Sequence, residues 1–231
     1  MNYDHIQTTD DSSFVEEATG FLLLRMQQSI DEYGKCILGL SGGSTPKPIY
    51  EELGHGNLDW SKVYIFLVDD RYVAADDDDS NQKLVRETLL KNCDIPESNL
   101  IFPNTEVPLE DCITDYEQRL AQLLSEGIPH MITLGMGDDG HIASLFPPVS
   151  DRAFTDHLVI HTQTEKFAVK DRISSTFVVL LSATDKIFFL KGDAKKAVWD
   201  EMLESEEEVD RWPAKAVLKM GGVTVVSDWK D

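Results

Sequence analysis

The sequence predicts an α/β protein whose mostly parallel sheet carries helices on both faces, in an open, Rossmann-like three-layer sandwich. Short apolar runs alternate along the chain with segments in which apolar residues recur at helical spacing. The run at 131–134 passes directly into Gly135, and those at 36–40 and 187–190 reach a glycine two residues later, as buried parallel strands do where they reach a loop. Neither an internal repeat nor a linker interrupts this alternation, so we expect residues 1–231 to form a single α/β domain.

The first helix and the strand after it are predicted from capping residues and periodicity. Asp11 or Ser12 caps a helix that runs to about Tyr33, where Gly34 ends it. A short apolar run at 36–40 then predicts a buried strand.

The other elements are predicted from the same two patterns, short apolar runs for strands and helical spacing for helices. The apolar run at 177–181 fits a strand and a helix equally well. Elsewhere we expect, in order, a strand at 63–68, a helix opened by Ser80 and Asn81, an edge strand at 100–102, a helix at 113–124, strands at 131–134, 157–161, 172–176 and 187–190, a helix from Asp193, and a strand at 223–226.

The composition excludes several classes of partner. The formal net charge is −21, which argues against binding to nucleic acid or to anionic membranes. Neither a membrane-spanning apolar stretch nor a signal-peptide pattern is present, so a cytoplasmic protein is expected. Cys36, Cys93 and Cys112 match neither a metal-binding pattern nor a disulfide framework, which predicts reduced thiols and no metal.

The stretch 131–147 holds the best candidates for acid–base chemistry. An apolar run reaches Gly135 and is followed by Asp139 and His141. Ligands bind where strands of such a sheet end, and a carboxylate beside a histidine fixes its tautomer. The alternative is a polar loop without a role. The glycine spacing also matches the dinucleotide-binding pattern, but the carboxylates would repel a pyrophosphate and Pro147 leaves no room for the full helix that the pattern requires.

A second Gly-rich turn spans residues 41–46. We expect Thr45 to be the N-cap and Pro46 the first residue of the following helix. The glycines and free N–H groups of such a turn favour an anion, and Ser41, Ser44 and Thr45 add hydroxyl donors. An ordinary strand-to-helix turn is the alternative, and a nucleotide-hydrolysing P-loop is disfavoured because the turn lacks its lysine.

The same turn also matches the nucleophile-elbow pattern of hydrolases, Gly39-x-Ser41-x-Gly43. On this reading Ser41 is a nucleophile and His141 is its base. Only one helix precedes the strand, which is too little chain for the sheet that normally comes before such an elbow. We therefore disfavour this reading.

Arg71 is the remaining candidate, because it follows Asp69 and Asp70 at the end of a predicted strand. A guanidinium there would neutralise a developing oxyanion. The alternative is a structural ion pair with Asp69 or Asp70.

Together these motifs resemble a known family. Ser41 to Pro46, the Asp69-Asp70-Arg71 group with Ser80-Asn81, and the block from Gly135 to Pro147 are similar to those of 6-phosphogluconolactonases, within the family that they share with glucosamine-6-phosphate deaminases. The resemblance covers nearly the whole chain and continues at Arg172-Ile173-Ser174, Gly192-x-x-Lys195 and Pro213-Ala214.

The resemblance implies hydrolysis of 6-phosphogluconolactone without a metal or other cofactor, by a monomer or weak homodimer. It implies that His141 is the base that activates water, that Asp139 supports it, and that Arg71 lies by the reacting end. It assigns the substrate phosphate to Ser41, Gly42, Gly43, Ser44, Thr45, Arg172 and Lys195. A sugar-phosphate-binding protein without catalysis is a further possibility, against which the retention of Arg71, Asp139 and His141 argues.

Two departures from the family pattern stand out. Asp70 replaces a glutamate, and Arg172 lacks the usual proline-rich lead-in. The deaminases carry a glutamate where this chain has Phe146, and they favour Gly-Thr-Gly-Ser where it has Ser41-Gly42-Gly43-Ser44. Both differences favour the lactonase.

Overall fold

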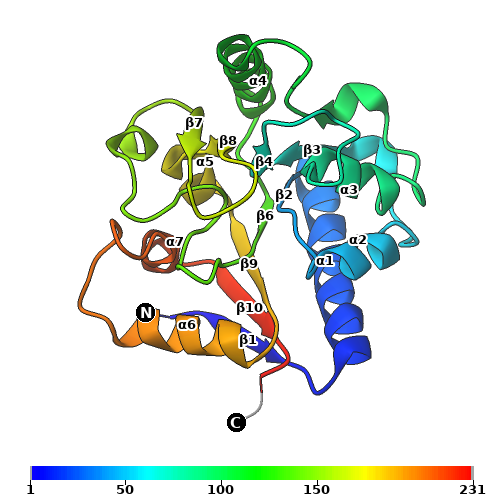
Figure 1. The fold of residues 1–231 in the computed structure, drawn as a ribbon. Helices are drawn as coiled ribbons and strands as arrows, with labels where there is room; N and C mark the ends of the chain where they lie inside the picture. The colour runs from blue at the N-terminus through cyan, green and yellow to red at the C-terminus, as the bar shows by residue number, and fades with distance from the viewer. Residues whose placement is uncertain (1, 230–231) are drawn as a thin grey trace.

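A seven-stranded parallel sheet forms the centre of the protein (Figure 1), as seen in a computed structural model that describes residues 2–229. Each strand runs parallel to its neighbours, which confirms the predicted fold class. The spatial order is β1 (Asp4–Gln7), β10 (Val223–Ser227), β9 (Asp185–Leu190), β6 (Met131–Leu134), β2 (Cys36–Leu40), β3 (Val63–Leu67) and β5 (Leu100–Ile101).

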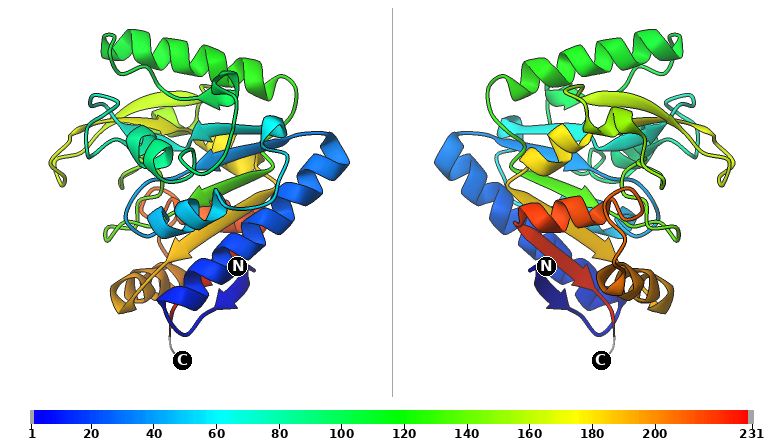
Figure 2. Two further views of the ribbon diagram at one scale, coloured as in Figure 1. Left: turned by 90° about the vertical axis from the view of Figure 1, so that its right-hand side faces the viewer. Right: turned by 90° about the vertical axis from the view of Figure 1, so that its left-hand side faces the viewer.

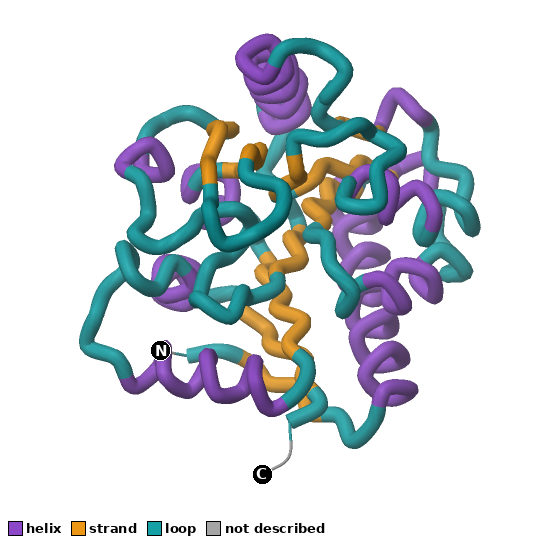
Figure 3. Tube along the Cα trace, viewed as in Figure 1, coloured by secondary structure: helices purple, strands orange, loops and turns teal. Residues whose placement is uncertain are grey.

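Helices cover both faces of this sheet (Figure 2), and the strands pass through the middle of the molecule between them (Figure 3). One face carries α1 (Asp11–Tyr33), α2 (Lys47–Leu53) and α3 (Asn81–Glu87); the other carries α4 (Leu109–Leu124), α5 (Phe177–Ser182), α6 (Asp193–Glu204) and α7 (Ala214–Met220).

The alternation of side chains along β2 accounts for these two layers. Leu38 and Leu40 pack in the hydrophobic cluster that contains α1, whereas Ile37 packs in the cluster that contains α4. Because both faces are buried, the strand is a continuous apolar run in the sequence. Short 3₁₀ helices within the described residues are η1 (Trp60–Lys62), η2 (Glu97–Asn99) and η3 (Asp151–Phe154).

A small antiparallel sheet stands beyond the carboxyl end of β3. Its strands, in order, are β4 (Asp69–Arg71), β8 (Asp171–Ser175) and β7 (Val159–Gln163). The sequence had placed Asp69 to Arg71 at the end of the preceding strand and had not predicted a separate strand there. The chain changes sheets at Val68, whose N–H donates to the Leu40 oxygen at 3.0 Å while its oxygen accepts from the Ser175 N–H at 2.8 Å.

Capping differs from the prediction at two helices. The Asp10 carboxylate, rather than Asp11 or Ser12, caps α1 by accepting the N–H of Ser13 at 2.9 Å. Helix α2 begins at Lys47 with Pro46 as its N-cap and no side-chain cap, so Thr45 does not cap it.

Three further segments complete the comparison with the sequence. The ambiguous run at 177–181 lies in helix α5, which Thr176 precedes as its N-cap. Strand β1 and helix α7 had not been predicted. Strand β1 has only one apolar residue, Ile6, and exists through its parallel pairing with β10 at the edge of the sheet.

Cys36, Cys93 and Cys112 are free thiols, and burial raises the pKa of each. Among residues 2–229, no helix combines the length and the apolar character that a membrane crossing requires.

The end of β3 depends on a buried tyrosine of α4. The Tyr116 hydroxyl donates to the Leu67 oxygen at 2.6 Å and accepts the Leu67 N–H at 3.1 Å. Tyr116→Phe removes a hydrogen-bond partner from both buried backbone groups, so we expect it to lower the free energy of unfolding by about 2 kcal/mol in urea denaturation. Tyr33→Phe, at an exposed ring, is the control and should change it by less than about 0.5 kcal/mol. Equal stability of the two variants would contradict this role.

Candidate active site

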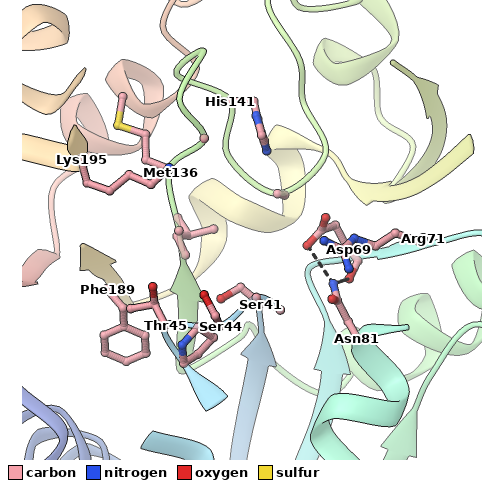
Figure 4. A pocket seen from close by; sticks show the side chains of 17 residues that line it. Ser41, Ser44, Thr45, Asp69, Arg71, Asn81, Met136, His141, Phe189 and Lys195 are labelled. Atoms are coloured by element: carbon pink, nitrogen blue, oxygen red, sulfur yellow. Dashed lines mark hydrogen bonds between the residues drawn. The ribbon is translucent and has the colours of Figure 1, made fainter. Parts of the chain in front are cut away.

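A cavity of about 240 Å³ opens at the carboxyl ends of β2, β6 and β9. Figure 4 shows His141 on one side of it, facing the turn that holds Ser41, Ser44 and Thr45, with Asp69, Arg71 and Asn81 to one flank and Lys195 to the other. Of the predicted site residues, those that line the cavity are Ser41, Gly42, Gly43, Ser44, Thr45, Arg71, His141 and Lys195; Asp139 contacts His141, and Arg172 lies outside the lining.

Asp139 and His141 form a hydrogen-bonded pair. Nδ1 of His141 lies 2.5 Å from Oδ1 of Asp139, whose Oδ2 accepts from Nζ of Lys166 at 2.9 Å. Burial opposes ionisation of Asp139, but the hydrogen bonds from His141 and Lys166 outweigh it and hold the pKa of this carboxyl well below its usual range. An ionised carboxylate can only accept, so Nδ1 carries a proton, and in the neutral imidazole Nε2 then keeps its lone pair.

The loop that carries His141 is shaped by a close backbone approach at Gly137. A Cβ atom at this position would lie 2.1 Å from Nδ1 and Cε1 of His141, so only glycine leaves space for the imidazole. The loop is closed by the hydrogen bond from the Gly137 N–H to the His141 oxygen at 2.9 Å. Arg211 supports it from outside by donating to the Asp139 oxygen at 2.8 Å.

The turn after β2 presents unused backbone donors to the cavity. The N–H groups of Gly42, Gly43, Ser44 and Thr45 donate to no other described residue. Such a turn is suited to an anion, because successive free backbone N–H groups in a turn form an anion-binding concavity.

Ser41 is engaged inside the protein instead. Its N–H donates to the Thr133 hydroxyl at 2.9 Å, and its own hydroxyl lies 3.2 Å from the same oxygen. Tyr50 closes the cluster by bonding to both Thr133 and the Ser41 oxygen. A nucleophilic serine needs a base within hydrogen-bonding reach, and the contacts of Ser41 are with hydroxyl groups. The geometry thus adds to the case against the hydrolase-elbow reading.

Asn81 and Asp69 join this turn to the rest of the site. A Cβ on Gly42 would lie 1.7 Å from Oδ1 of Asn81, so the turn rests directly on that side chain. Nδ2 of Asn81 donates to the Asp69 oxygen at 2.8 Å. The Asp69 carboxylate in turn accepts the hydroxyl of Ser144 at 2.6 Å.

Arg71 forms no ion pair with Asp69 or Asp70 among the described residues, so the structural-pair alternative is not observed. One of its terminal nitrogens donates to the Asp79 oxygen at 2.6 Å, and its buried Nε has no hydrogen-bond partner within residues 2–229. The guanidinium therefore retains donor capacity beside the cavity.

Asp70 has a structural role. Its carboxylate accepts the N–H groups of Arg71 and Asn81, both at 2.7 Å, and so caps the start of α3. Burial raises the pKa of Asp70 to about 7, against the effect of these donors.

Arg172 and Lys195, both predicted for the phosphate, lie apart. Arg172 is opposite Arg71 in the β4–β8 pairing, donates through Nε to the Val169 oxygen at 3.0 Å and lies over the ring of Phe167. Burial and the charge of Arg71 lower its pKa. Lys195, in the first turn of α6, lines the cavity and pairs with Asp138 at 2.5 Å.

Sequence reasoning missed Lys166 and Phe167, which the hairpin between β7 and β8 carries to His141. Nothing in the surrounding sequence distinguishes this segment from a solvated loop, because its proximity to the site arises from strand pairing alone.

Comparisons with known proteins agree with the resemblance seen in the motifs. Residues 9–226 match the family model for glucosamine-6-phosphate isomerases and 6-phosphogluconolactonases. The chain is 44% identical over 224 residues to a probable 6-phosphogluconolactonase of Dictyostelium discoideum, covering 94% of each chain. It is 33% identical to the 6-phosphogluconolactonase of a Synechocystis species, over 90% of this chain and 88% of that one.

Solved structures give the same result. The structure of 6-phosphogluconolactonase from Thermotoga maritima matches with a TM-score of 0.85 and 26% identity, covering 98% of this chain and 99% of the other. The one from Shewanella baltica matches with a TM-score of 0.84 and 31% identity, covering 98% and 97%.

The close approach at Gly137 generates a test of the His141–Asp139 pair. The short hydrogen bond at Nδ1 should give a strongly downfield proton resonance, and Gly137→Ala should remove or shift it because the new methyl group occupies the place of the ring. Gly135→Ala is the matched control in the same loop, since a Cβ there meets nothing within 4 Å. Proton NMR of both variants checks this, and an unchanged resonance in Gly137→Ala would contradict the assigned geometry.

Proposed function

This chain belongs to the family of glucosamine-6-phosphate isomerases and 6-phosphogluconolactonases, and we propose that it hydrolyses 6-phosphogluconolactone to 6-phosphogluconate, the second step of the oxidative pentose phosphate route. The observation that carries the proposal is the geometry of His141. Its Nδ1 is held by the ionised Asp139, and the ring faces, across one cavity, a turn of unused N–H donors. A base and an anion site at opposite walls suit a substrate with an ester at one end and a phosphate at the other.

The lactonase is favoured over the deaminase by the surroundings of the same histidine. The deaminases carry a glutamate where this chain has Phe146. The centroid of the Phe146 ring lies 4.7 Å from the centroid of the His141 ring. An apolar ring cannot shuttle the protons that deamination requires. Hydrolysis of a lactone needs one base and stabilisation of one oxyanion, and the site offers groups for both.

In the proposed mechanism, Nε2 of His141 takes a proton from water while that water attacks the carbonyl carbon C1. Asp139 stabilises the imidazolium that forms. The carbonyl oxygen becomes an oxyanion, which Arg71 stabilises, at roughly 3 kcal/mol for a well-placed donor. Protonated His141 then returns its proton to the ring oxygen as the C1–O bond breaks. No covalent intermediate is required, because a lactone is already an activated ester.

The phosphate end of the substrate is assigned to the turn at 41–45 with Lys195. Ser44 and Thr45 line the cavity and add hydroxyl donors to the backbone N–H groups. Arg172 lies beside Arg71 and adds positive charge near the cavity. The two guanidiniums repel one another, and an anion bound near them would relieve this repulsion. Holding the phosphate fixes C1 near the base, and this positioning accelerates the reaction.

The decisive experiment supplies freshly made 6-phosphogluconolactone and follows acid release above the spontaneous rate. We expect fast release by the parent and a fall in kcat of about 10²–10⁴-fold in His141→Ala, because a positioned base contributes that much. His157→Ala is the matched control. That histidine is exposed and contacts Glu117, so its loss should leave the rate unchanged.

A parallel reaction with glucosamine 6-phosphate tests the other branch of the family. We expect no ammonia. Release of ammonia without lactone hydrolysis would transfer the chain to the deaminases, and undiminished turnover in His141→Ala would refute the base assignment.

Lys195→Ala tests the phosphate end. Lys195 contacts the phosphate before and during the reaction in this proposal, so its loss should raise KM by about 10- to 100-fold with kcat little changed. Lys196→Ala is the control in the same helix turn, because Lys196 pairs with Asp200 and does not line the cavity. Steady-state kinetics tests whether Lys195 acts at the phosphate end or at the reacting end. A fall in kcat alone would assign it to the chemistry instead.

A further inference from the structure

The loop between β7 and β8 reaches the His141–Asp139 pair with two side chains. Phe167 lies edge-on to the His141 ring, with centroids 5.5 Å apart, and it also contacts the ring of Phe146 and the guanidinium of Arg172. These contacts anchor the loop against the site. They bring the preceding residue, Lys166, to Asp139, with Nζ 2.9 Å from Oδ2.

Asp139 is therefore shared by two hydrogen-bonding partners through different oxygens. Oδ1 holds Nδ1 of His141 at 2.5 Å, and Oδ2 holds Lys166. The carboxylate is largely buried, with 13% of its side chain exposed, whereas Lys166 is 57% exposed. Lys166 is thus the solvent-facing end of a hydrogen-bonded chain that passes through Asp139 to His141, which lines the cavity.

We propose that Lys166 is a positioning residue for the reaction, which fixes the Asp139 carboxylate and by its charge keeps His141 in the neutral, proton-accepting form. The inference rests on the proposed role of His141 as the base. It adds a residue to that role, since a base flanked only by a buried carboxylate would hold its proton too firmly to act at mildly acidic pH.

The physical argument is a balance of charges around the imidazole. A carboxylate at Nδ1 stabilises the imidazolium, and a lysine on the same carboxylate cancels part of that effect. The remaining charged groups near the pair belong to other elements and are unchanged when Lys166 is replaced. They are Asp138 with Lys195, Arg211 on the Asp139 backbone, Arg172 against Phe167, and Asp69 and Arg71 across the cavity.

The alternative is that the ion pair only tethers the loop. A tether would act equally at every pH. A charge effect would be confined to the pH range in which His141 titrates, so the two readings differ in a pH profile.

The chain offers a matched control in the same loop. Lys170 has the same side chain and the same exposure of 57%, but it pairs with Glu165. Lys166→Met and Lys170→Met change the net charge equally, and only the first removes the partner of Asp139. Lys166→Arg keeps the charge and tests for rescue.

The experiment measures two quantities for the parent and the three variants. The first is the titration midpoint of the His141 imidazole by NMR, without substrate. The second is the acid limb of the pH profile of kcat/KM for lactone hydrolysis. In Lys166→Met we expect both to move up by about 0.5 to 1 pH unit, so that kcat/KM falls about 3- to 10-fold on the acid limb and recovers at alkaline pH. Lys170→Met and Lys166→Arg should match the parent.

The outcomes separate this inference from the proposed function. An unmoved NMR midpoint in Lys166→Met overturns the inference whatever the activity, and an equal loss of rate at every pH identifies the tether instead. A midpoint that moves while the acid limb stays fixed supports the charge effect of Lys166 and overturns His141 as the base.

Discussion

The buried Asp69 is the point at which the separate segments of the site are joined. Its backbone oxygen accepts Asn81, on which the turn at Gly42 rests, and its carboxylate accepts Ser144 from the loop that carries His141. Within β4 it also pairs with Ser174, whose hydroxyl accepts the Ser144 N–H at 3.2 Å. Buried polar groups of this kind must be satisfied together, because each unpaired member would cost free energy. The turn at 41–45, strand β4 with Arg71, and the loop that carries His141 are consequently held in one relative arrangement.

That arrangement places cationic side chains at and around the cavity of an acidic protein. The chain carries a net charge of −21, yet Lys166, Lys195 and Arg211 gather around the histidine loop and Arg71 and Arg172 lie in adjacent strands. Surface carboxylates are screened beyond about 10 Å in ordinary salt, whereas donors beside a partly enclosed cavity act at short range and lower dielectric. The local donors, rather than the global field, decide whether an anion binds.

The sequence predicted the parts of this site that depend on local geometry. Gly42, Gly137, Asp139 and His141 lie within short motifs, and their spacing alone indicates a turn or a paired histidine. The parts that depend on pairing between distant strands could not be predicted. Strand β4 was not predicted because its three polar residues show no apolar period, and it is a strand through its pairing with β8. Lys166 and Phe167 were not predicted as part of the site, for the same reason. The place of Arg172 beside Arg71 is set by that register, which no local pattern encodes.

The ion pair between Lys195 and Asp138 bears on how a phosphate enters the proposed site. The pair is close, at 2.5 Å, but the Asp138 side chain is 86% exposed. An exposed carboxylate gains little from one lysine, because water solvates it nearly as well. A phosphate in the cavity would meet Lys195 together with the N–H groups of the turn, and a dianion that accepts several charge-assisted hydrogen bonds gains more from the same lysine than Asp138 does. Replacing Asp138 by the phosphate as the ion-pair partner of Lys195 therefore costs little free energy. The lysine is held near its working position before the substrate arrives, and its charge is already paired without being buried.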